Sequence, residues 1–346
     1  MPLAQTDSDA RDRPIRIPET VLGRDDEQVA IRRAIQTPGQ ARLHIAGPRG
    51  SGKTLLTAVV LADAPTPVCY VPCRRDDTQY QVLSRLTATL TGEIVTDGYR
   101  TAHLQRRVTA ALAETPLVLV LDDVEFLLEH DGDDLLYGLS RLETADQLTI
   151  VTTATPAVDL PTAVDARTYS SYQPQNLSVA PYTEREATQI LKHHARVVVP
   201  QPVTDAAVQR LARQTTNIHV GLHWLRRAAE VHDQQAVITA PTIQVLRWDA
   251  VHRYWSDTLT DFTRHHAIVL NAVEQVTAEA ARPYTGMVYD RYAMLCRFQG
   301  WAPLTSRRFS DFLDHLDLLG LIQVDHFRGG TEGKTRAIRL TPLEEL

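Results

Sequence analysis

Short apolar runs alternate with helical patterns in the first half of this chain, and helical patterns dominate the second half. Apolar runs at 67–71, 117–121 and 148–153, and another that begins at residue 41, predict β-strands. Helical stretches separate the runs, one of them at 80–90. Strands that alternate with helices indicate a parallel α/β sheet that is covered by helices on both faces.

From about residue 181 the periodicity of apolar positions is helical. Patterns over 183–196, 205–214 and 219–231 predict a small all-helical lid, and 241–264 predicts a connecting helix. The last block is typical of a winged helix, because three helical patterns precede short strands at 321–324 and 337–340. The predicted domains are a disordered tail at 1–17, an α/β base at 18–180, a lid at 181–248, a connecting helix at 249–264 and a winged-helix domain at 265–346.

Composition limits the class of protein. The 346 residues are 43% hydrophobic and 23% charged, which is ordinary for a soluble globular protein. No apolar stretch approaches the roughly 20 residues that span a membrane, and the polar start has no signal-peptide core. We therefore expect a cytoplasmic protein with no membrane partner.

Cysteine usage and charge exclude further classes. Cys69, Cys73 and Cys296 are too few for a disulfide framework, and the first two flank an apolar run, so we predict core packing instead of a metal site. The net charge of −6 excludes a wholly basic coat for nucleic acid and leaves a local basic face open.

A glycine-rich segment carries the strongest chemical signal. It is the G-x-x-x-x-G-K-T motif of Gly47, Pro48, Arg49, Gly50, Ser51, Gly52, Lys53 and Thr54, set between a predicted strand and a predicted helix. Glycines let consecutive N–H groups turn toward a phosphate, and the positive helix end adds to this attraction. We expect Lys53 to reach the β- and γ-phosphates and Thr54 to hold Mg²⁺. The motif predicts an ATP or ADP site with Mg²⁺.

The run LVLVLDDVEF at 117–126 supplies the carboxylates for this site. A buried strand that ends at Asp122 suits a carboxylate that orients Mg²⁺, so Thr54 and Asp122 are the candidate metal-binding residues. Hydrolysis usually needs a longer carboxylate beside it to position the attacking water, and this chain has Asp123 there. Two interpretations of Asp123 stay open: a slow catalytic residue, or a cap of the following helix.

The segment 305–320 predicts a recognition helix. Thr305 or Ser306 can cap its start, and Gly320 can end it in the left-handed conformation. Arg307 and Arg308 stand in the first turn, where such a helix presents groups to base edges or phosphates. Its apolar positions repeat at helical spacing and form one face: Phe309, Phe312, Leu313, Leu316 and Leu319 or Gly320.

The glycine-rich loop after this helix carries Arg328, Lys334 and Arg336, and such a wing can lie along a phosphate backbone or enter a minor groove. The acidic residues Asp311, Asp314 and Asp317 fall further along the helix. We therefore favour double-stranded DNA as the ligand. The alternative is a winged helix used for protein contacts, with solvated arginines.

These segments together resemble the archaeal origin-recognition initiators, AAA+ relatives of the eukaryotic origin-recognition and helicase-loading subunits. The resemblance covers most of 18–340 and is most specific at 285–322. Other segments that carry it are PETVLGRDDE (18–27), CYVPCRRDDTQYQVLSRLTATL (69–90), RTYSS (167–171) and APYTERE (180–186). It implies an AAA+ P-loop base with a parallel sheet, an all-helical lid and a C-terminal winged helix.

The resemblance also implies a function and further site residues. It implies a nucleoid-associated protein that binds origin DNA under ATP control, recruits the replicative minichromosome-maintenance helicase and can self-associate on DNA. A helical insertion in the base, between about Gln81 and Tyr99, is expected to touch DNA as well. Arg24 and its neighbours are expected to border the adenine pocket, and Tyr182 is a further nucleotide-binding candidate.

Departures from the family pattern indicate a divergent paralogue. Asp123 replaces the usual glutamate, and the polar sensor falls near Thr153 or Ala154. His219 occupies the place of the lid arginine and would be mostly uncharged at neutral pH. Arg167 is either the arginine that contacts nucleotide across an interface or a member of a surface salt bridge. The predominance of arginine over lysine is common in high-GC genomes, including those of salt-loving archaea.

Three classes of function follow. The first is an ATP-switched replication initiator with slow hydrolysis, at most a weak ATPase used as a switch. The second is a winged-helix transcriptional regulator with the same fold. The third is an AAA+ protein remodeller with rapid ATP turnover, against which Asp123 and His219 count.

Overall fold

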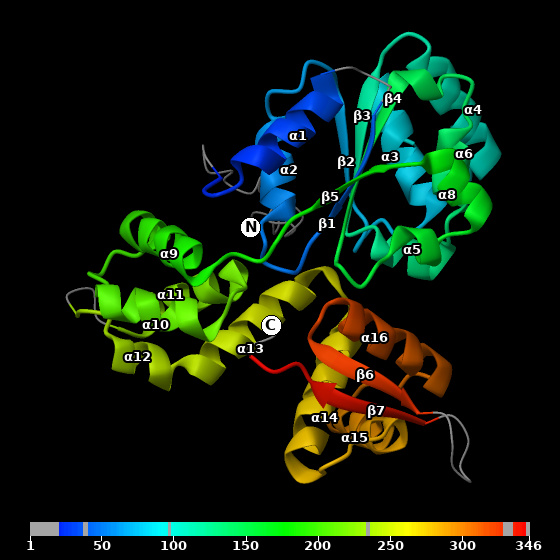
Figure 1. The fold of residues 1–346 in the computed structure, drawn as a ribbon. Helices are drawn as coiled ribbons and strands as arrows, with labels where there is room; N and C mark the ends of the chain where they lie inside the picture. The colour runs from blue at the N-terminus through cyan, green and yellow to red at the C-terminus, as the bar shows by residue number, and fades with distance from the viewer. Residues whose placement is uncertain (1–20, 37–40, 96–97, 233–235, 328–334, 344–346) are drawn as a thin grey trace, which may run out of the picture.

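The computed structural model describes residues 21–36, 41–95, 98–232, 236–327 and 335–343, and these form a base, a helical lid and a winged helix (Figure 1). The predicted tail at 1–17 lies outside the described residues. An α/β unit, a group of helices and a final three-helix block with two strands follow one another along the chain. This is the fold class that the sequence predicts.

The base is built on a parallel five-stranded sheet with the order β2-β3-β4-β1-β5. Four of its strands are the predicted apolar runs. The fifth, β5, has the polar sequence QNLS at the sheet edge, and no apolar run in the sequence predicts it. The strands are β1 (Arg42–Ala46), β2 (Val68–Pro72), β3 (Leu117–Asp122), β4 (Leu148–Ala154) and β5 (Gln175–Ser178).

Helices cover both faces of the sheet, as predicted (Figure 1). On β3, Val118 and Val120 pack with α1 and α2, whereas Leu119 and Leu121 pack with α3 and α4. Because side chains alternate across a strand, one apolar run serves both cores. The base helices are α1 (Asp25–Gln36), α2 (Lys53–Leu61), α3 (Gln79–Thr91), α4 (Thr101–Leu112), α5 (Glu125–Asp131), α6 (Asp134–Ser140), α7 (Leu160–Ala163) and α8 (Ala166–Tyr172), with a 3₁₀ turn at Ala145–Gln147.

The expected insertion between Gln81 and Tyr99 falls on α3 and on its connection to α4. The two helices pack on each other, and a capping box between Thr78 and Gln81 begins α3. Ile94 and Tyr99 lie exposed in the connection. The segment of the expected insertion therefore belongs to a pair of packed helices on the side of the base.

The lid consists of α9 (Glu184–Val198), α10 (Asp205–Gln214), α11 (Ile218–Val231) and α12 (Ala240–Val245). The predicted continuous helix at 241–264 is wrong. Leu246 leaves the helical conformation with φ −87° and ψ 8° and separates α12 from α13 (Arg247–Thr258). A 3₁₀ turn, η2 (Leu259–Asp261), then ends the connection, after which Phe262 is extended.

The C-terminal part is a winged helix made of α14 (Arg264–Glu279), α15 (Thr285–Phe298), α16 (Ser306–Leu318), β6 (Ile322–Phe327) and β7 (Thr335–Leu340). The signals at the ends of α16 are confirmed: the Thr305 hydroxyl accepts from the N–H of Arg308, and Gly320 is left-handed with φ 66°. The predicted apolar face of α16 is buried: Phe309, Phe312, Leu313, Leu316 and Leu319.

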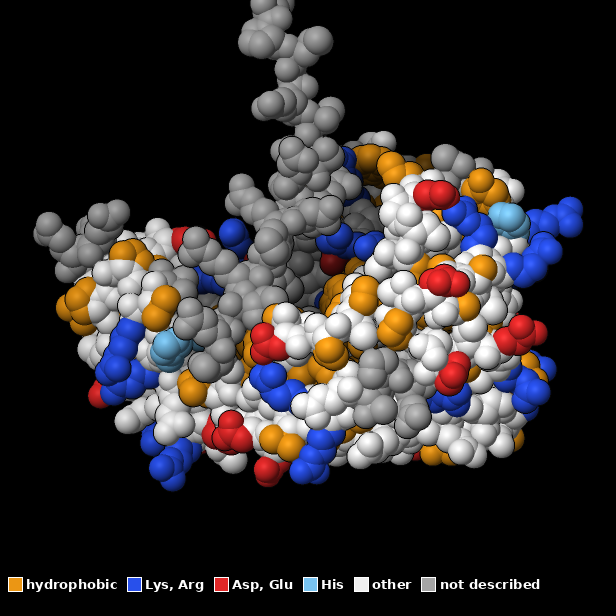
Figure 2. All heavy atoms as spheres, turned by 90° about the horizontal axis from the view of Figure 1, so that it is seen from above, with side chains coloured by type: hydrophobic (Ala, Val, Ile, Leu, Met, Phe, Trp, Pro, Cys, Tyr) orange, Lys and Arg blue, Asp and Glu red, His pale blue; other side chains and the backbone are white. Residues whose placement is uncertain are grey.

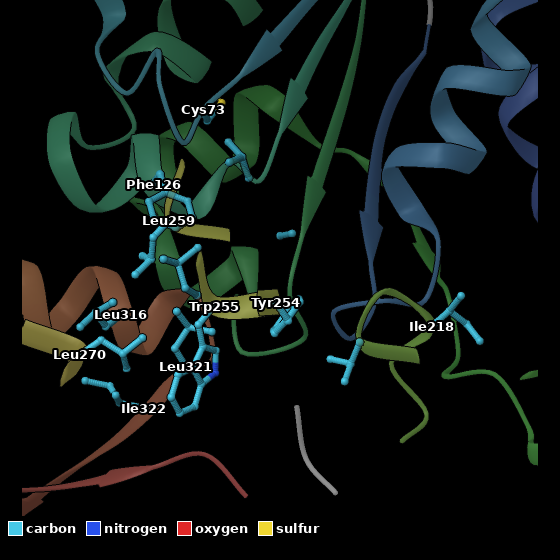
Figure 3. Packing of buried hydrophobic residues seen from close by; sticks show 14 of the residues in the cluster. Cys73, Phe126, Ile218, Tyr254, Trp255, Leu259, Leu270, Leu316, Leu321 and Ile322 are labelled. Atoms are coloured by element: carbon cyan, nitrogen blue, oxygen red, sulfur yellow. The ribbon is translucent and has the colours of Figure 1, made fainter. Parts of the chain in front are cut away.

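One apolar cluster runs through all three parts, and Figure 3 shows its central region. Leu259 of η2 lies beside Phe126 of the base, and Trp255 of α13 lies beside Leu321 of the winged helix, with Leu316 of α16 facing the same region. α16 also contacts α5 directly. The winged helix therefore rests on the base instead of extending away from it on a linker.

Candidate functional site

The glycine loop at 47–52 joins β1 to α2 and is held tightly by other parts of the chain. Gly50 and Gly52 are left-handed, with φ 73° and φ 88°. A Cβ at Gly47 would lie 2.5 Å from the carbonyl oxygen of Val179, and one at Gly50 would lie 2.0 Å from Oδ1 of Asn217. A Cβ at Gly52 would lie 2.8 Å from the hydroxyl of Tyr182. Only glycine fits these positions.

Lys53 lies over this loop. Its ammonium donates to the carbonyl oxygen of Gly47 at 2.7 Å and to that of Pro48 at 3.0 Å. Burial lowers the pKa of Lys53, and Arg49 adds to this, against the opposite effect of Asp123 and its acidic neighbours. A cation held in place inside a ring of backbone groups is suited to bind a phosphate.

Asp122 is the centre of a network of hydroxyl groups. Its carboxylate accepts from Thr54 at 3.0 Å and 3.2 Å, from Tyr70 at 2.6 Å and from Thr153 at 2.6 Å. Burial and then the charge of Asp123 raise the pKa of Asp122, while the hydroxyl donors oppose the rise. The predicted neighbours Thr54 and Asp122 are thus adjacent, and their oxygens are of the kind that Mg²⁺ prefers.

Asp123 forms an ion pair in the structure, and its slow catalytic role stays a prediction. It is left-handed with φ 55°, and its carboxylate lies 2.5 Å from Nε of Arg74. Burial alone would raise the pKa of Asp123, but Arg74 and then Arg49 lower it below the usual range. The capping interpretation is wrong, because Val124 is the N-cap of α5 and no side chain caps that helix. Asp123 is an ionised partner of Arg74.

Glu125 is a site residue that the sequence reasoning missed, although LVLVLDDVEF contains it. It is 3% exposed, and Oε1 lies 3.8 Å from the guanidinium of Arg49 and accepts from the N–H of Thr155 at 3.3 Å. Burial and the charge of Asp123 raise its pKa to about 7. The site therefore contains a buried carboxyl group that changes charge near neutral pH.

Arg24 and Tyr182 form the border of the loop that faces α1. The guanidinium of Arg24 lies 4.1 Å from the centre of the Tyr182 ring and donates to the carbonyl oxygens of Ser51 at 3.2 Å and Ala180 at 2.6 Å. Both side chains are buried. The sequence places them 158 positions apart, and the structure brings both to the same loop.

Several polar atoms around the loop fit a polar ligand. Among the described residues, buried side-chain atoms with no hydrogen-bond partner include Nε of Arg24, Oγ of Ser51 and Nδ2 of Asn217. Buried polar groups are usually hydrogen-bonded, and three around one glycine loop point to a ligand with several acceptors and donors. Seen from above, the molecule is hollowed between lid and base, with side chains of both charges at the floor (Figure 2).

The lid contributes the start of α11. Asn217 caps this helix by accepting from the N–H groups of His219 and Val220. Desolvation lowers the pKa of His219 below its ordinary value, and His223 and Arg74 add to this, so the ring is neutral as the sequence predicts. Arg213 of α10 is no substitute for this ring, because it pairs with Glu184 at 2.9 Å on the lid surface.

Arg167 lies apart from the loop on α8. Its guanidinium pairs with Asp134 at 3.3 Å and with Asp165 at 3.6 Å, and lies 5.0 Å from the centre of the Tyr137 ring. It is 59% exposed. It thus makes the surface salt bridge of the second interpretation, and contact with a neighbouring molecule's nucleotide stays a prediction.

The proposed DNA-binding arginines are divided between exposed and paired positions. Arg307 and Arg308 are exposed at the start of α16, and Arg308 lies 3.7 Å from Asp311. Arg336 of β7 pairs with Asp314 of α16 at 2.6 Å and so ties the wing to the helix. Arg328 and Lys334 lie outside the described residues.

Other classes of site find no support in the described part of the chain. It holds no cluster of three or more histidine, cysteine, aspartate or glutamate side chains that could bind a metal ion by themselves. The predicted burial of Cys69, Cys73 and Cys296 is confirmed. Within the same residues, no helix has the length and apolar character for a membrane span.

The buried Glu125 predicts a pH dependence of stability. Its pKa of about 7 lies above the ordinary 4.5, so the folded protein retains a proton that the unfolded chain releases, and the free energy of unfolding falls as pH rises through this range. We expect Glu125→Gln to remove the effect. From pH 5 to pH 8 the variant should gain about 1–3 kcal/mol relative to wild type, measured by chemical denaturation.

The matched control for that measurement is Glu129→Gln, an exposed glutamate on the same helix α5. It should follow the wild-type pH profile. If Glu125→Gln also follows it, Glu125 does not titrate in the expected range.

Comparisons with known proteins agree with this architecture. The family model of the AAA ATPase domain matches residues 20–151, and that of the CDC6 C-terminal winged helix domain matches residues 257–345. An ORC1-type DNA replication protein of Thermococcus kodakarensis is 28% identical over 332 residues, which cover 88% of this chain and 79% of that protein.

Two solved structures share the fold. The ORC1 protein of Aeropyrum pernix in complex with DNA has a TM-score of 0.71 and 22% identity, and covers 95% of this chain and 92% of its own. The ORC2 protein of the same organism, in ADPNP and ADP complexes, has a TM-score of 0.55 and 18% identity over 94% of this chain and 91% of its own. The chain therefore joins an AAA ATPase domain to a C-terminal CDC6 winged helix domain, and over most of its length it is similar to archaeal ORC1-type DNA replication proteins.

Proposed function

We propose that this chain is an ATP-binding DNA replication initiator that recognises origin DNA. The observation that carries the proposal is the combination, in one packed molecule, of a glycine phosphate loop with the Thr54–Asp122 pair and a winged helix that exposes Arg307 and Arg308. The relatives named ORC1-type DNA replication protein match both parts over most of the chain.

Nucleotide is proposed to bind over the glycine loop. Lys53 would hold the phosphates, and Thr54 with Asp122 would hold Mg²⁺, which when bound neutralises phosphate charge. Arg24 and Tyr182 would border the base of the nucleotide. An ORC2 structure with the same fold is described in complexes with ADPNP and ADP, which supports an adenine nucleotide as the ligand.

Hydrolysis is proposed to be slow. Asp123 has the position of the water-positioning carboxylate, but it is short, left-handed and paired with Arg74 at 2.5 Å. His219 brings no charge to the lid at neutral pH because its pKa lies below the ordinary value of a histidine. These features suit a switch that depends on which nucleotide is bound more than on turnover.

Double-stranded DNA is proposed to contact two parts of the chain. The first is the start of α16 with Arg307 and Arg308, together with the wing. The second is the α3–α4 hairpin. There the ring of Tyr99 stacks on that of His103 with 4.9 Å between ring centres, and the guanidinium of Arg107 lies 6.0 Å from the centre of the Tyr99 ring. The ORC1 structure of the same fold is a complex with DNA.

Two further partners follow from the proposal. The minichromosome-maintenance helicase would be recruited by the DNA-bound protein, which would associate with the nucleoid. A second copy of this chain on DNA would bring Arg167 to its neighbour's nucleotide. Since Arg167 is 59% exposed, it is free to change partners at small cost.

The first prediction concerns the phosphate loop. Lys53→Ala should lower the affinity for ADP and ATP about a hundredfold or more, because it removes the charged donor beside the phosphates. Titration with a fluorescent ADP derivative measures this. Lys192→Ala, which removes a partly exposed lysine paired with Asp205 on the lid, is the control and should bind normally. Lys53→Ala should retain the DNA affinity of the winged helix.

The second prediction concerns α16. Replacement of both Arg307 and Arg308 by alanine should weaken duplex binding about tenfold or more and lower the salt slope of log K by about two. Fluorescence anisotropy at several salt concentrations measures both values. The charge-matched control replaces Arg210 and Arg213, exposed on the lid. An unchanged affinity for the first variant would remove α16 from the DNA interface.

The proposed biological role is tested by mapping where the protein binds DNA in its host, together with replication profiling. We expect a few sharp peaks at replication start sites. Peaks over promoters without replication starts would favour a transcriptional regulator. Rapid ATP turnover without discrete peaks would favour a protein remodeller.

A further inference from the structure

Arg49 links the phosphate loop to the winged helix. Its guanidinium donates a hydrogen bond to the carbonyl oxygen of Leu318, the last residue of α16, and lies 3.8 Å from Oε1 of Glu125. Its Cδ would lie 3.6 Å from a Cβ on Gly320, which ends that helix. One side chain from the loop thus touches α5 of the base and the C-terminal end of α16.

The position at the helix end gives this contact its strength. The last carbonyl groups of a helix have no partner within the helix and carry partial negative charge, so a cation there is stabilising. Arg49 supplies that cation to the helix whose opposite end exposes Arg307 and Arg308. The contact therefore anchors the proposed recognition helix to the nucleotide site.

The interface between base and winged helix includes further contacts and leaves space beside Arg49. The Phe126 ring lies 6.0 Å from the His315 ring, and Arg75 of the base pairs with Asp261 of η2. A cavity of about 240 Å³ borders Arg49 and is lined by the lid, α13 and the winged helix through Asn217, Tyr254 and Gln323, among others. This cavity gives the guanidinium of Arg49 room for a change of position.

The cations around the loop differ in how firmly they are held. Arg24 is held by Tyr182 and two carbonyl groups, and Arg74 is held by Asp123. Arg49 instead shares its charge between a neutral carbonyl and Glu125, whose pKa of about 7 lets it lose its charge near neutral pH. Hydrogen bonds to a charged acceptor are about twice as strong as those between neutral groups. A phosphate oxygen is therefore a better acceptor for Arg49 than Leu318 is.

We propose that Arg49 is a positioning residue that exchanges the end of α16 for the terminal phosphate of a bound nucleoside triphosphate, and so releases the winged helix from the base. The proposal rests on the proposed nucleotide site. Arg49 would thereby detect the terminal phosphate, which the neutral His219 of the lid cannot do by charge. With a diphosphate bound, Arg49 keeps its bond to Leu318 and the winged helix stays docked.

The experiment measures the distance between base and winged helix in the full chain. Glu114→Cys and Gln299→Cys place spectroscopic labels at exposed positions, and the native cysteines are buried. Distances are measured without nucleotide, with Mg²⁺ and ADP, and with Mg²⁺ and a non-hydrolysable ATP analogue. We expect the analogue alone to lengthen the distance in the wild type.

Arg49→Gln is the decisive variant. It should show the long distance under all three conditions and lose about tenfold in its preference for the triphosphate over ADP. Phe126→Ala, which loosens the same interface away from the loop, should lengthen the distance while the preference for triphosphate stays. Arg49→Lys keeps the charge and should retain part of the response, which gives a second test if Arg49→Gln fails to fold.

The outcomes separate this proposal from the function on which it rests. If the wild type binds neither nucleotide, the proposed function fails and the exchange at Arg49 fails with it. If it binds both and the distance does not respond to the triphosphate, only the exchange fails. The exchange at Arg49 would also be overturned if the Arg49→Gln variant showed the same distances as the wild type under all three conditions.

Discussion

The need of a buried carboxylate for hydrogen-bond donors organises the nucleotide site. Asp122 ends β3 at a place closed to water, and its charge is satisfied by hydroxyl groups of Thr54, Tyr70 and Thr153. Those residues come from α2, β2 and β4, so one charge fixes the ends of the neighbouring strands against the start of the helix after the glycine loop. This network also positions Lys53 and the loop, because Thr54 follows them directly in the chain.

The polarity of α16 connects that site to the other end of the molecule. Its start exposes Arg307 and Arg308, and its end is packed on the base near Arg49 and Phe126. A helix is rigid over this length, so a change at one end moves the other. The shared apolar cluster around Trp255 holds the two parts close enough for a single arginine to reach across.

The sequence by itself determined the parts whose signals are local. The glycine loop, the apolar strands and the lid helices follow from spacing along a few residues, and the structure has them within a few positions of the prediction. The ends of α16 followed from Thr305 and Gly320 for the same reason, since caps depend on neighbouring residues. β5 was not predicted because a polar edge strand has no apolar run. The prediction of one helix over 241–264 was wrong because no proline or glycine marks the break at Leu246.

Only the tertiary structure decided which charged groups meet. Arg74 pairs with Asp123 across 49 positions of sequence, and Arg49 reaches Leu318 across 269. Periodicity carries no information on such distances, because they are set by how sheet, lid and winged helix pack. The same packing buries Glu125 and raises its pKa to about 7, which its neighbours in sequence do not require. Local patterns therefore fix the elements and the loop, while the partner of each charge depends on the burial that tertiary packing creates.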